Sequence, residues 1–244
     1  QLAGSSSLII TSDTTFYVAT NGNDSTGNGS SGSPWATPTK AAQYLSQRRI
    51  KGGVIVTVSI GAGDYTFSST LIIEHPQSSQ IKYVGATPAG NKPFGNALKG
   101  TANPTPIRGN TSSSKTYNNN LLTSYYTTRF LFNNCIGFLV GGGNNVNLQN
   151  ILIRGNNGTL GDGTSARGII VESGRAGGLG GAIDLRNCAI HNFKGAGIAL
   201  VFGGNAKFND LTITNCGGGV SNNSGVVFGD ASSLGLSVPL TVSN

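Results

Sequence analysis

The chain of 244 residues contains no methionine, few charged residues and no long apolar segment. Because only 10% of the residues are charged, its polar surface must come from uncharged groups, which the many Asn, Ser, Thr and Gly residues supply. No apolar run approaches the ~20 residues that cross a bilayer, and no leader with a charged start and an apolar centre is present. The sequence therefore predicts no membrane insertion. Since residue 1 is glutamine, we expect the chain to be a segment of a longer or processed polypeptide.

Acidic residues are scarce and unevenly placed. The chain has nine of them, and none lies between Glu74 and Asp162. Basic residues do occur in that interval, which favours an anionic partner and leaves the interval unable to form a catalytic carboxylate pair by itself. They are Lys82, Lys92, Lys99, Arg108, Lys115, Arg129 and Arg154. Because they are dispersed singly and no nucleic-acid motif accompanies them, we expect no nucleic-acid partner.

Patterns typical of metal sites are missing as well. The three cysteines are odd in number and lack CxxC spacing, so we interpret them as packing thiols. Residues 21–25 (NGNDS) resemble a calcium loop only superficially, because they contain one carboxylate. No ligand or triad partner stands at the required spacing from His75 or His191, and we expect His191 at the surface. The sequence predicts no metal and no cofactor.

The first fifth of the chain predicts one strand, one loop and one helix. Residues 16–20 (FYVAT) are β-branched and aromatic, which indicates a strand, and residues 21–33 form a loop of Gly, Ser and Asn. A Thr-Pro pair at 37–38 is a favourable helix start, with a hydroxyl as N-cap and proline at the first helical position. Apolar residues follow at helical spacing until a Gly-Gly pair. We expect a helix at about 38–50 and short strands after it.

Three later segments repeat one pattern. Residues 146–153, 183–190 and 206–213 each have two apolar residues one apart, an Asn or Asp two further on, and a second apolar pair. Two strands joined by a tight bend require this pattern, because Asn and Asp tolerate the left-handed conformation. The offsets of 37 and 23 residues fit stacked turns of three short strands, the first turn carrying a loop. Stacking would align the fixed residues as a hydrogen-bonded side-chain ladder of Asn150, Asn187 and Asp210.

The repeat predicts an all-β chain that forms a right-handed parallel β-helix. Residues 197–200 and 225–228 would be the third strands of successive turns, and residues 240–244 restart the pattern. Because the pattern stops in mid-turn, we expect the β-helix to continue beyond the last residue. A β-sandwich is the alternative fold, since sandwiches also alternate short strands with Gly and Asn turns.

The N-terminal part resembles a known group of proteins. The stretch FYVATNGNDSTGNG, followed by SPWATPTKAAQYL and VIVTVSIGAGDYTFSSTLII, is similar to the opening of right-handed parallel β-helix proteins of the pectate-lyase-like superfamily, in particular those of bacteriophage tail fibres and tailspikes. With the later turns, the resemblance covers residues 15–244. It implies a cap at 15–53 whose helix covers the open end of the β-helix of 54–244. The small and polar residues 1–14 predict an arm or linker, and residues 85–128, which contain four of the eight prolines, predict an insertion in the β-helix.

The resemblance also implies a function. We expect a virion structural protein, a homotrimeric segment of a tail fibre or tailspike whose rigid shaft attaches to the host cell. Its partners would be other tail or baseplate proteins and host cell-surface polysaccharide. Two alternatives stay open: a polysaccharide depolymerase, acting as a lyase or glycoside hydrolase on host capsule or lipopolysaccharide, and a secreted bacterial β-helix adhesin or carbohydrate lyase. The same scaffold serves all of these functions.

Two groups of residues are candidates for chemistry or binding. The late carboxylates Asp162, Glu172 and Asp184 would be catalytic if they converge on one face, since glycoside hydrolases use clustered carboxylates. An aromatic and basic cluster in or beside the insertion would stack on sugar rings and hold an acidic group. This glycan-binding candidate consists of Tyr117, Tyr125, Tyr126 and Arg129.

Overall fold

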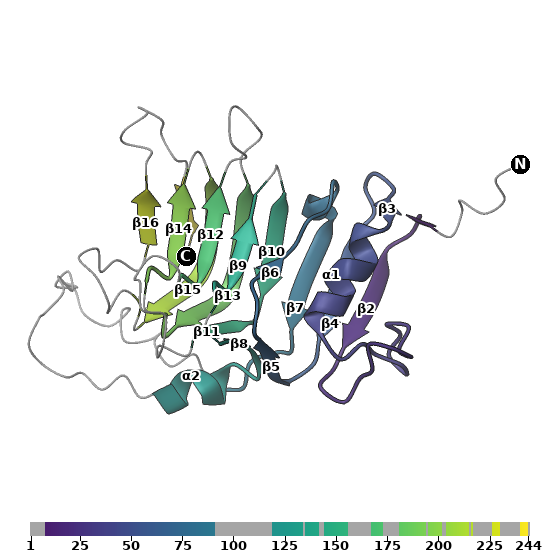
Figure 1. Cartoon of the computed structure of the whole chain (residues 1–244), viewed down its shortest axis with the longest axis horizontal. Helices are drawn as coiled ribbons and strands as arrows, with labels where there is room; N and C mark the ends of the chain where they lie inside the picture. Colours follow the sequence, from purple (N-terminus) through teal and green to yellow (C-terminus); the bar gives the residue numbers. More distant parts are fainter. Residues whose placement is uncertain are drawn as a thin grey trace, which may run out of the picture.

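The computed structural model describes residues 8–90, 119–133, 135–141, 144–155, 167–172, 181–193, 195–201, 204–214, 216, 226–229 and 240–243, and this part of the chain is mostly β-strand (Figure 1). The two α-helices within it are short: α1 spans Pro38–Ser46 and α2 spans Asn119–Tyr125. All pairings between its strands are parallel. The prediction of an all-β chain with parallel sheets is confirmed at this level, and the antiparallel ladders of a sandwich are absent from the described residues.

The strands follow one another in triplets. The first three triplets are β4 (Val56–Ile60), β5 (Gly63–Phe67) and β6 (Leu71–Ile72); β7 (Ile81–Gly85), β8 (Thr128–Phe132) and β9 (Phe138–Val140); and β10 (Asn145–Gln149), β11 (Leu152–Gly155) and β12 (Ile169–Glu172). In the next two, one long strand replaces the first two members: β13 (Ala182–His191) with β14 (Ile198–Val201), and β15 (Asn205–Thr214) with β16 (Val226–Gly229); β17 (Leu240–Ser243) comes last. Each member pairs with its counterpart in the next triplet.

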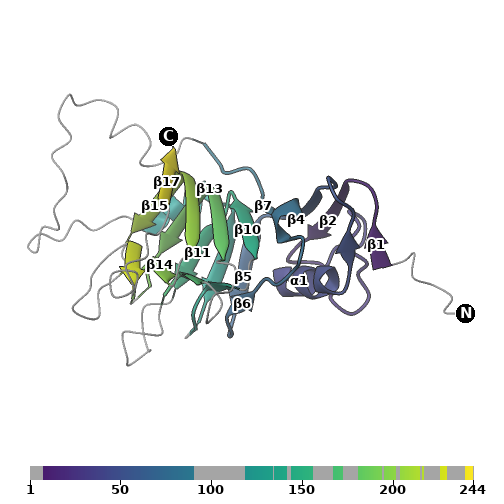
Figure 2. The same ribbon diagram turned by 90° about the horizontal axis from the view of Figure 1, so that it is seen from above.

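This pairing joins the triplets into long sheets. The first and second members contribute to a ten-stranded sheet, and the third members form a five-stranded sheet in the order β16-β14-β12-β9-β6. A two-stranded sheet of β1 (Ile9–Ile10) and β3 (Arg49–Ile50) lies at the N-terminal end, where β2 (Thr14–Val18) also pairs with β4. Figures 1 and 2 show the strands side by side from β2 in purple to the late strands in yellow-green.

The core is one continuous apolar cluster that contains side chains from both long sheets. In β4, β7 and β10 every second side chain is buried, as the period of two requires. Parallel register then places buried residues of successive strands beside one another, and one such column consists of Val58, Tyr83, Leu148, Leu185 and Phe208. Removing apolar surface from water stabilises the folded state by roughly 25 cal/mol per Å². Packing in these columns is therefore the main contribution to the stability of the fold.

The bends between first and second members are formed by the fixed residues of the sequence repeat. Asn150, Asn187 and Asp210 have φ angles of 59°, 46° and 63°, in the left-handed region that Asn and Asp tolerate. The Asn187 Nδ2 atom donates a hydrogen bond to Asn150 Oδ1 at 2.9 Å. The three residues therefore stack in neighbouring strands, and side-chain amides bond along the stack at Asn150 and Asn187.

The N-terminal end is covered by α1 and an aromatic group. The rings of Phe16, Trp35 and Tyr44 pack together with centroids 4.7–5.3 Å apart, and Figures 1 and 2 both place α1 beside β2 and β4. Thr37 caps the helix, because its Oγ1 accepts a hydrogen bond from the Lys40 N–H.

The predicted helix end at residue 50 is wrong. The helix ends at Ser46, after which Arg49 and Ile50 extend to pair with Ile9 and Ile10. Pairing of β3 with β1 satisfies the backbone N–H and C=O groups that would otherwise form hydrogen bonds within a longer helix. The predicted arm at 1–14 is partly built into the fold by the same pairing. Ile9 and Ile10 form β1, and Thr14 begins β2. Residues 1–7 lie outside the described part.

Candidate functional site

The end of the insertion packs against the outside of the strand bends. Leu122 of α2 and the adjoining Tyr126 form a second apolar cluster with Leu152 and Ala189. Leu152 and Ala189 point away from the main core, but they are fully buried because this segment covers them. Figure 1 shows α2 below β8 and β11. Residues 119–126 are therefore anchored to the sheet.

Tyr125 and Tyr126, two of the glycan-binding candidates, belong to this contact. Tyr126 is fully buried, so it presents no ring face to a sugar, and Tyr125 is half-buried against the same cluster. Their hydroxyl groups donate to Asn187 Oδ1 at 3.4 and 3.5 Å. Burial, with smaller contributions from Cys188, Tyr125 and Asp210, raises the pKa of Tyr126 well above its ordinary value. Both tyrosines fix the end of α2 to the side-chain ladder at Asn187. Tyr117 lies outside the described residues.

Arg129, the basic member of that candidate, lies at the edge of an open hollow. Its Nε forms an ion pair with the Asp64 carboxylate, and its Nη1 donates to the Thr123 carbonyl oxygen at 2.9 Å. The hollow is lined by Asp64, Thr123, Ser124, Arg129, Leu131 and Arg154. Basic groups are thus gathered where α2 meets β5, β8 and β11, although the tyrosines face elsewhere.

The candidate catalytic carboxylates do not form a described cluster. Glu172 ends β12 in the five-stranded sheet and Asp184 lies in β13 of the ten-stranded sheet, while Asp162 is outside the described residues. Within the described part of the chain no group of three or more His, Cys, Asp or Glu side chains could hold a metal ion.

The one carboxylate of the calcium-like loop has a structural partner. Asp24 Oδ1 accepts hydrogen bonds from the Ala36 and Thr37 N–H groups at 2.7 and 3.1 Å, and Oδ2 accepts one from Thr37 Oγ1 at 2.6 Å. These bonds tie the loop to the start of α1, where a carboxylate is also favoured by the helix dipole.

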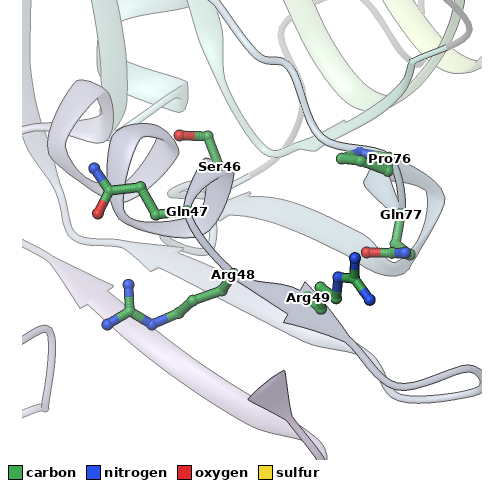
Figure 3. A pocket seen from close by; sticks show the side chains of 6 residues that line it. All are labelled: Ser46, Gln47, Arg48, Arg49, Pro76 and Gln77. Carbon is green, nitrogen blue, oxygen red and sulfur yellow. The ribbon is translucent and has the colours of Figure 1, made fainter. Parts of the chain in front are cut away.

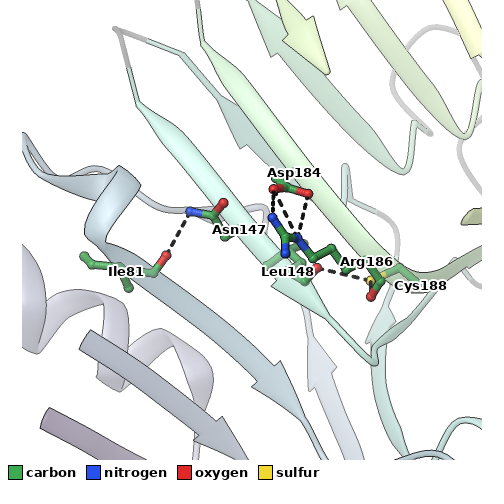
Figure 4. Close-up of polar contacts among 6 residues, drawn as sticks. All are labelled: Ile81, Asn147, Leu148, Asp184, Arg186 and Cys188. Carbon is green, nitrogen blue, oxygen red and sulfur yellow. Dashed lines mark hydrogen bonds and ion pairs between the residues drawn. The ribbon is translucent and has the colours of Figure 1, made fainter. Parts of the chain in front are cut away.

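Asp184 lies in a polar groove on the outer face of the ten-stranded sheet. It receives the Arg186 guanidinium through Nε at 3.2 Å and Nη2 at 2.8 Å, as Figure 4 shows. This ion pair raises the pKa of Arg186. The groove is also lined by residues of β7 and β10, including Lys82, Asn147 and Gln149.

Parallel register aligns these outer side chains in two rows. Lys82, Asn147, Asp184 and Lys207 form one row, and Gln149, Arg186 and Asn209 form the other. Neighbouring strands are ~4.8 Å apart, so each row presents hydrogen-bond donors and acceptors at regular intervals. Such a surface can bind hydroxyl groups along an extended polar ligand. Of these residues, sequence reasoning named only Asp184 as a site candidate, and the available signal for the others was the polar second and fourth position of each repeat.

A second hollow lies beside the end of α1. Its lining includes Ser46, Gln47, Arg48, Arg49, Pro76 and Gln77, drawn in Figure 3. The Arg48 guanidinium stacks over the Tyr44 ring at 3.3 Å from the centroid and donates to the Tyr44 carbonyl oxygen at 3.0 Å. Gln77 Oε1 accepts from the Ile50 N–H at 3.3 Å. These contacts stabilise the end of α1, and the exposed Arg49 side chain forms no hydrogen bond or ion pair with a described residue.

The two histidines are buried, so the expectation of a surface His191 is wrong. His191 is 1% exposed and His75 is 3% exposed. His75 Nδ1 accepts from the Gln77 N–H at 2.9 Å, so its Nε2 carries the proton that it donates to the Arg48 carbonyl oxygen at 2.8 Å. This histidine links the loop after β6 to the end of α1.

Comparisons with known proteins assign no family to this fold and site: no family model matches the chain, and searches of curated proteins and of solved structures find no significant match. Among the described helices, none is long and apolar enough to cross a membrane.

Proposed function

We propose that the chain is a right-handed parallel β-helix of the pectate-lyase-like type and a segment of a bacteriophage tail fibre or tailspike. The observation that carries the proposal is the recurrence of strand triplets directly behind the segment that resembles phage proteins. Each triplet pairs in parallel with the next, and the bends recur at Asn150, Asn187 and Asp210. This recurrence is typical of a solenoid whose repeats contact only their neighbours.

In this proposal the chain is a rigid, adhesive shaft. The continuous core and the Asn150–Asn187 hydrogen bond would resist bending, as an attachment fibre needs. The regular rows around Asp184 and Arg186 support recognition of surface glycans, whose hydroxyl groups match an array of amide and charged groups. The proposal includes a parallel homotrimer, a place in the virion tail, and tail or baseplate proteins as neighbours.

The adhesive proposal is tested by locating the protein and by measuring binding. Immunogold labelling with antibody against the chain is expected to mark the tails of virions that encode it. Light scattering after size-exclusion chromatography is expected to give the mass of a trimer, and a panel of bacterial surface polysaccharides should include a ligand. Particles that encode the chain but carry no label on the tail would rule the proposal out.

A depolymerase is the second candidate, because Asp184 and Arg186 lie together in a groove. A lyase needs a base and a hydrolase needs an acid and a second carboxylate, but the Asp184 carboxylate is engaged by Arg186. We therefore expect no new reducing ends and no unsaturated uronates after incubation with a polysaccharide that the chain binds. Release of either product, lost in Asp184→Asn, would identify an enzyme instead.

A further inference from the structure

An arginine on the outer face beside α2 has no counter-charge within the described structure. Arg154 lies in β11, between Leu131 of β8 and His191 of β13 in the parallel register. Its side chain is half-buried, yet it makes no hydrogen bond or ion pair with any described residue. Its guanidinium lines the hollow beside α2, where it can donate charge-assisted hydrogen bonds to a bound anion.

The neighbouring arginine is oriented toward the same hollow. Arg129 uses Nε for Asp64 and Nη1 for the Thr123 carbonyl oxygen, and its Nη2 makes no hydrogen bond with any described residue. Both arginines line the hollow together with Thr123 and Ser124. Two fork-shaped guanidinium groups are the usual means of binding a carboxylate or phosphate, because they donate parallel hydrogen bonds.

The single acidic group in the lining does not neutralise the hollow. Asp64 lies in β5, two strands from β11, and it forms no ion pair with Arg154 in the described structure. Its carboxylate is paired with Arg129 instead. The lining of two arginines and one aspartate therefore keeps one positive charge, located at Arg154.

We propose that this hollow is a binding subsite for an oxyanion, with Arg154 as the principal ligand and Arg129 Nη2 as the second. The oxyanion is the carboxylate of an acidic sugar or a phosphate ester, which share the same hydrogen-bond chemistry. That the subsite receives an acidic group of a host glycan rests on the proposed function, whereas anion binding itself does not. Both strands are central in their sheet, so the two guanidinium groups are held on a rigid support.

The test uses the full chain labelled with nitrogen-15 at arginine, followed through the side-chain Nε–H signals. Glucuronate and glucose 6-phosphate are titrated separately, with glucose as the neutral control. We expect saturable shifts of the Arg154 and Arg129 signals with at least one of the two anions and none with glucose. Added sodium chloride should weaken the binding, because a partly exposed site is screened.

Variants separate the charge from the fork geometry. Arg154→Gln is expected to weaken anion binding about tenfold or more, the loss of one charge-assisted interaction. Arg154→Lys is expected to bind the anion more weakly than the parent and more tightly than Arg154→Gln, since it keeps the charge and loses the fork-shaped guanidinium. Arg49→Gln, which removes an exposed arginine at the other end of the molecule, should bind like the parent. Each variant must retain the far-ultraviolet spectrum of the parent.

No saturable binding of either anion, or equal binding by Arg154→Gln, overturns the proposal. Tighter binding of glucuronate than of glucose 6-phosphate identifies a sugar carboxylate as the ligand, and the reverse order identifies a phosphate ester. Anion binding by a chain that labels no virion tail and binds no bacterial polysaccharide would leave the subsite standing and reject the proposed function.

Discussion

Asn187 combines a left-handed backbone with a side-chain hydrogen bond, and few residues can do both. Its φ is 46°, and its Nδ2 donates to Asn150 Oδ1. Its Oδ1 also accepts from the Tyr125 and Tyr126 hydroxyl groups. Alanine would lose these hydrogen bonds and meet a steric cost at positive φ, whereas glycine would lose the hydrogen bonds without that steric cost.

These two losses can be measured separately. Asn187→Gly is expected to lower the free energy of unfolding by about 1–3 kcal/mol, because it removes the bond to Asn150 and the acceptor of the Tyr125 and Tyr126 hydroxyl groups. Asn187→Ala is expected to lower it by about 1–2 kcal/mol more, the cost of a left-handed alanine. Urea unfolding of both variants checks this. An alanine variant no less stable than the glycine variant would show that the backbone conformation is not the constraint.

Tyr65 makes stability depend on alkaline pH. Burial raises the pKa of Tyr65 from 10.0 to about 12, and its hydroxyl donates to the Gly61 carbonyl oxygen at 3.1 Å. The raised pKa means that the folded state favours the protonated phenol. Its contribution is therefore complete below pH 10 and is lost as the pH rises through about 12.

The urea-derived free energy of unfolding should accordingly decrease between pH 10 and about 12. Burial also raises the pKa of Tyr83 and Tyr126, so they add to the decrease from about pH 10 upward and extend it to higher pH than Tyr65 does. Tyr65→Phe is expected to reduce the slope in this interval, since phenylalanine does not ionise. An unchanged slope would assign the alkaline loss to other groups.

At the scale of the element, the loop before α1 is shaped by Trp35. Gly29 has φ of 79°, and a Cβ atom there would lie 2.7 Å from Trp35 Cη2. Gly32 lies in the same loop, and a Cβ atom there would meet nothing within 4 Å. The two glycines therefore form a matched pair, of which only Gly29 is restricted by its surroundings.

Gly29→Ala is expected to destabilise the cap by about 1–3 kcal/mol, the range for a residue held in a sparsely populated conformation, and Gly32→Ala should change stability by less than about 0.5 kcal/mol. Trp35 is the single tryptophan of the chain and is buried, so its fluorescence during urea unfolding reports the cap directly. Equal effects of the two substitutions would contradict the contact with Trp35.

Asp24 is the second determinant of the cap, because one carboxylate satisfies two backbone N–H groups and the Thr37 hydroxyl. Asp24→Ala leaves these donors without their partner and should lower the free energy of unfolding by about 1–3 kcal/mol. Since the carboxylate is occupied by these donors, adding calcium should not raise the melting temperature of the parent chain. A calcium-dependent increase that Asp24→Ala abolishes would restore the calcium-loop interpretation.

At the scale of the whole molecule, the cap and the strand triplets share one core. Buried residues from Val18 and Trp35 to Phe208 belong to a single cluster, and β2 of the cap continues the ten-stranded sheet through β4. The cap therefore has no core of its own, and its unfolding should be coupled to that of the strands.

We expect thermal unfolding followed by Trp35 fluorescence and by far-ultraviolet circular dichroism to give coincident midpoints, as a cooperative transition requires. Gly29→Ala should lower both midpoints together. A fluorescence transition well below the circular dichroism transition would show that the cap unfolds independently, as can occur in proteins built of neighbouring repeats.

Local structure follows from patterns of neighbouring residues. The spacing of apolar pairs around Asn150, Asn187 and Asp210 predicts strands joined by left-handed bends, because the period of two and the tolerance of positive φ are properties of individual residues. The Thr-Pro helix start is likewise local, and α1 begins at Pro38. The end of that helix could not be predicted, since it depends on pairing of Arg49 and Ile50 with β1, some forty residues earlier.

Which side chains meet depends on contacts between strands that are distant in the sequence. Tyr126 looked available to a ligand, but α2 places it on Leu152 and Ala189, which come much later in the chain. Arg129 acquires Asp64 as its partner and Arg154 as its neighbour through parallel register between β5, β8 and β11. The polar rows around Asp184 arise in the same way. Register between strands distant in sequence is set by packing of the whole core, so no local pattern could specify these sites.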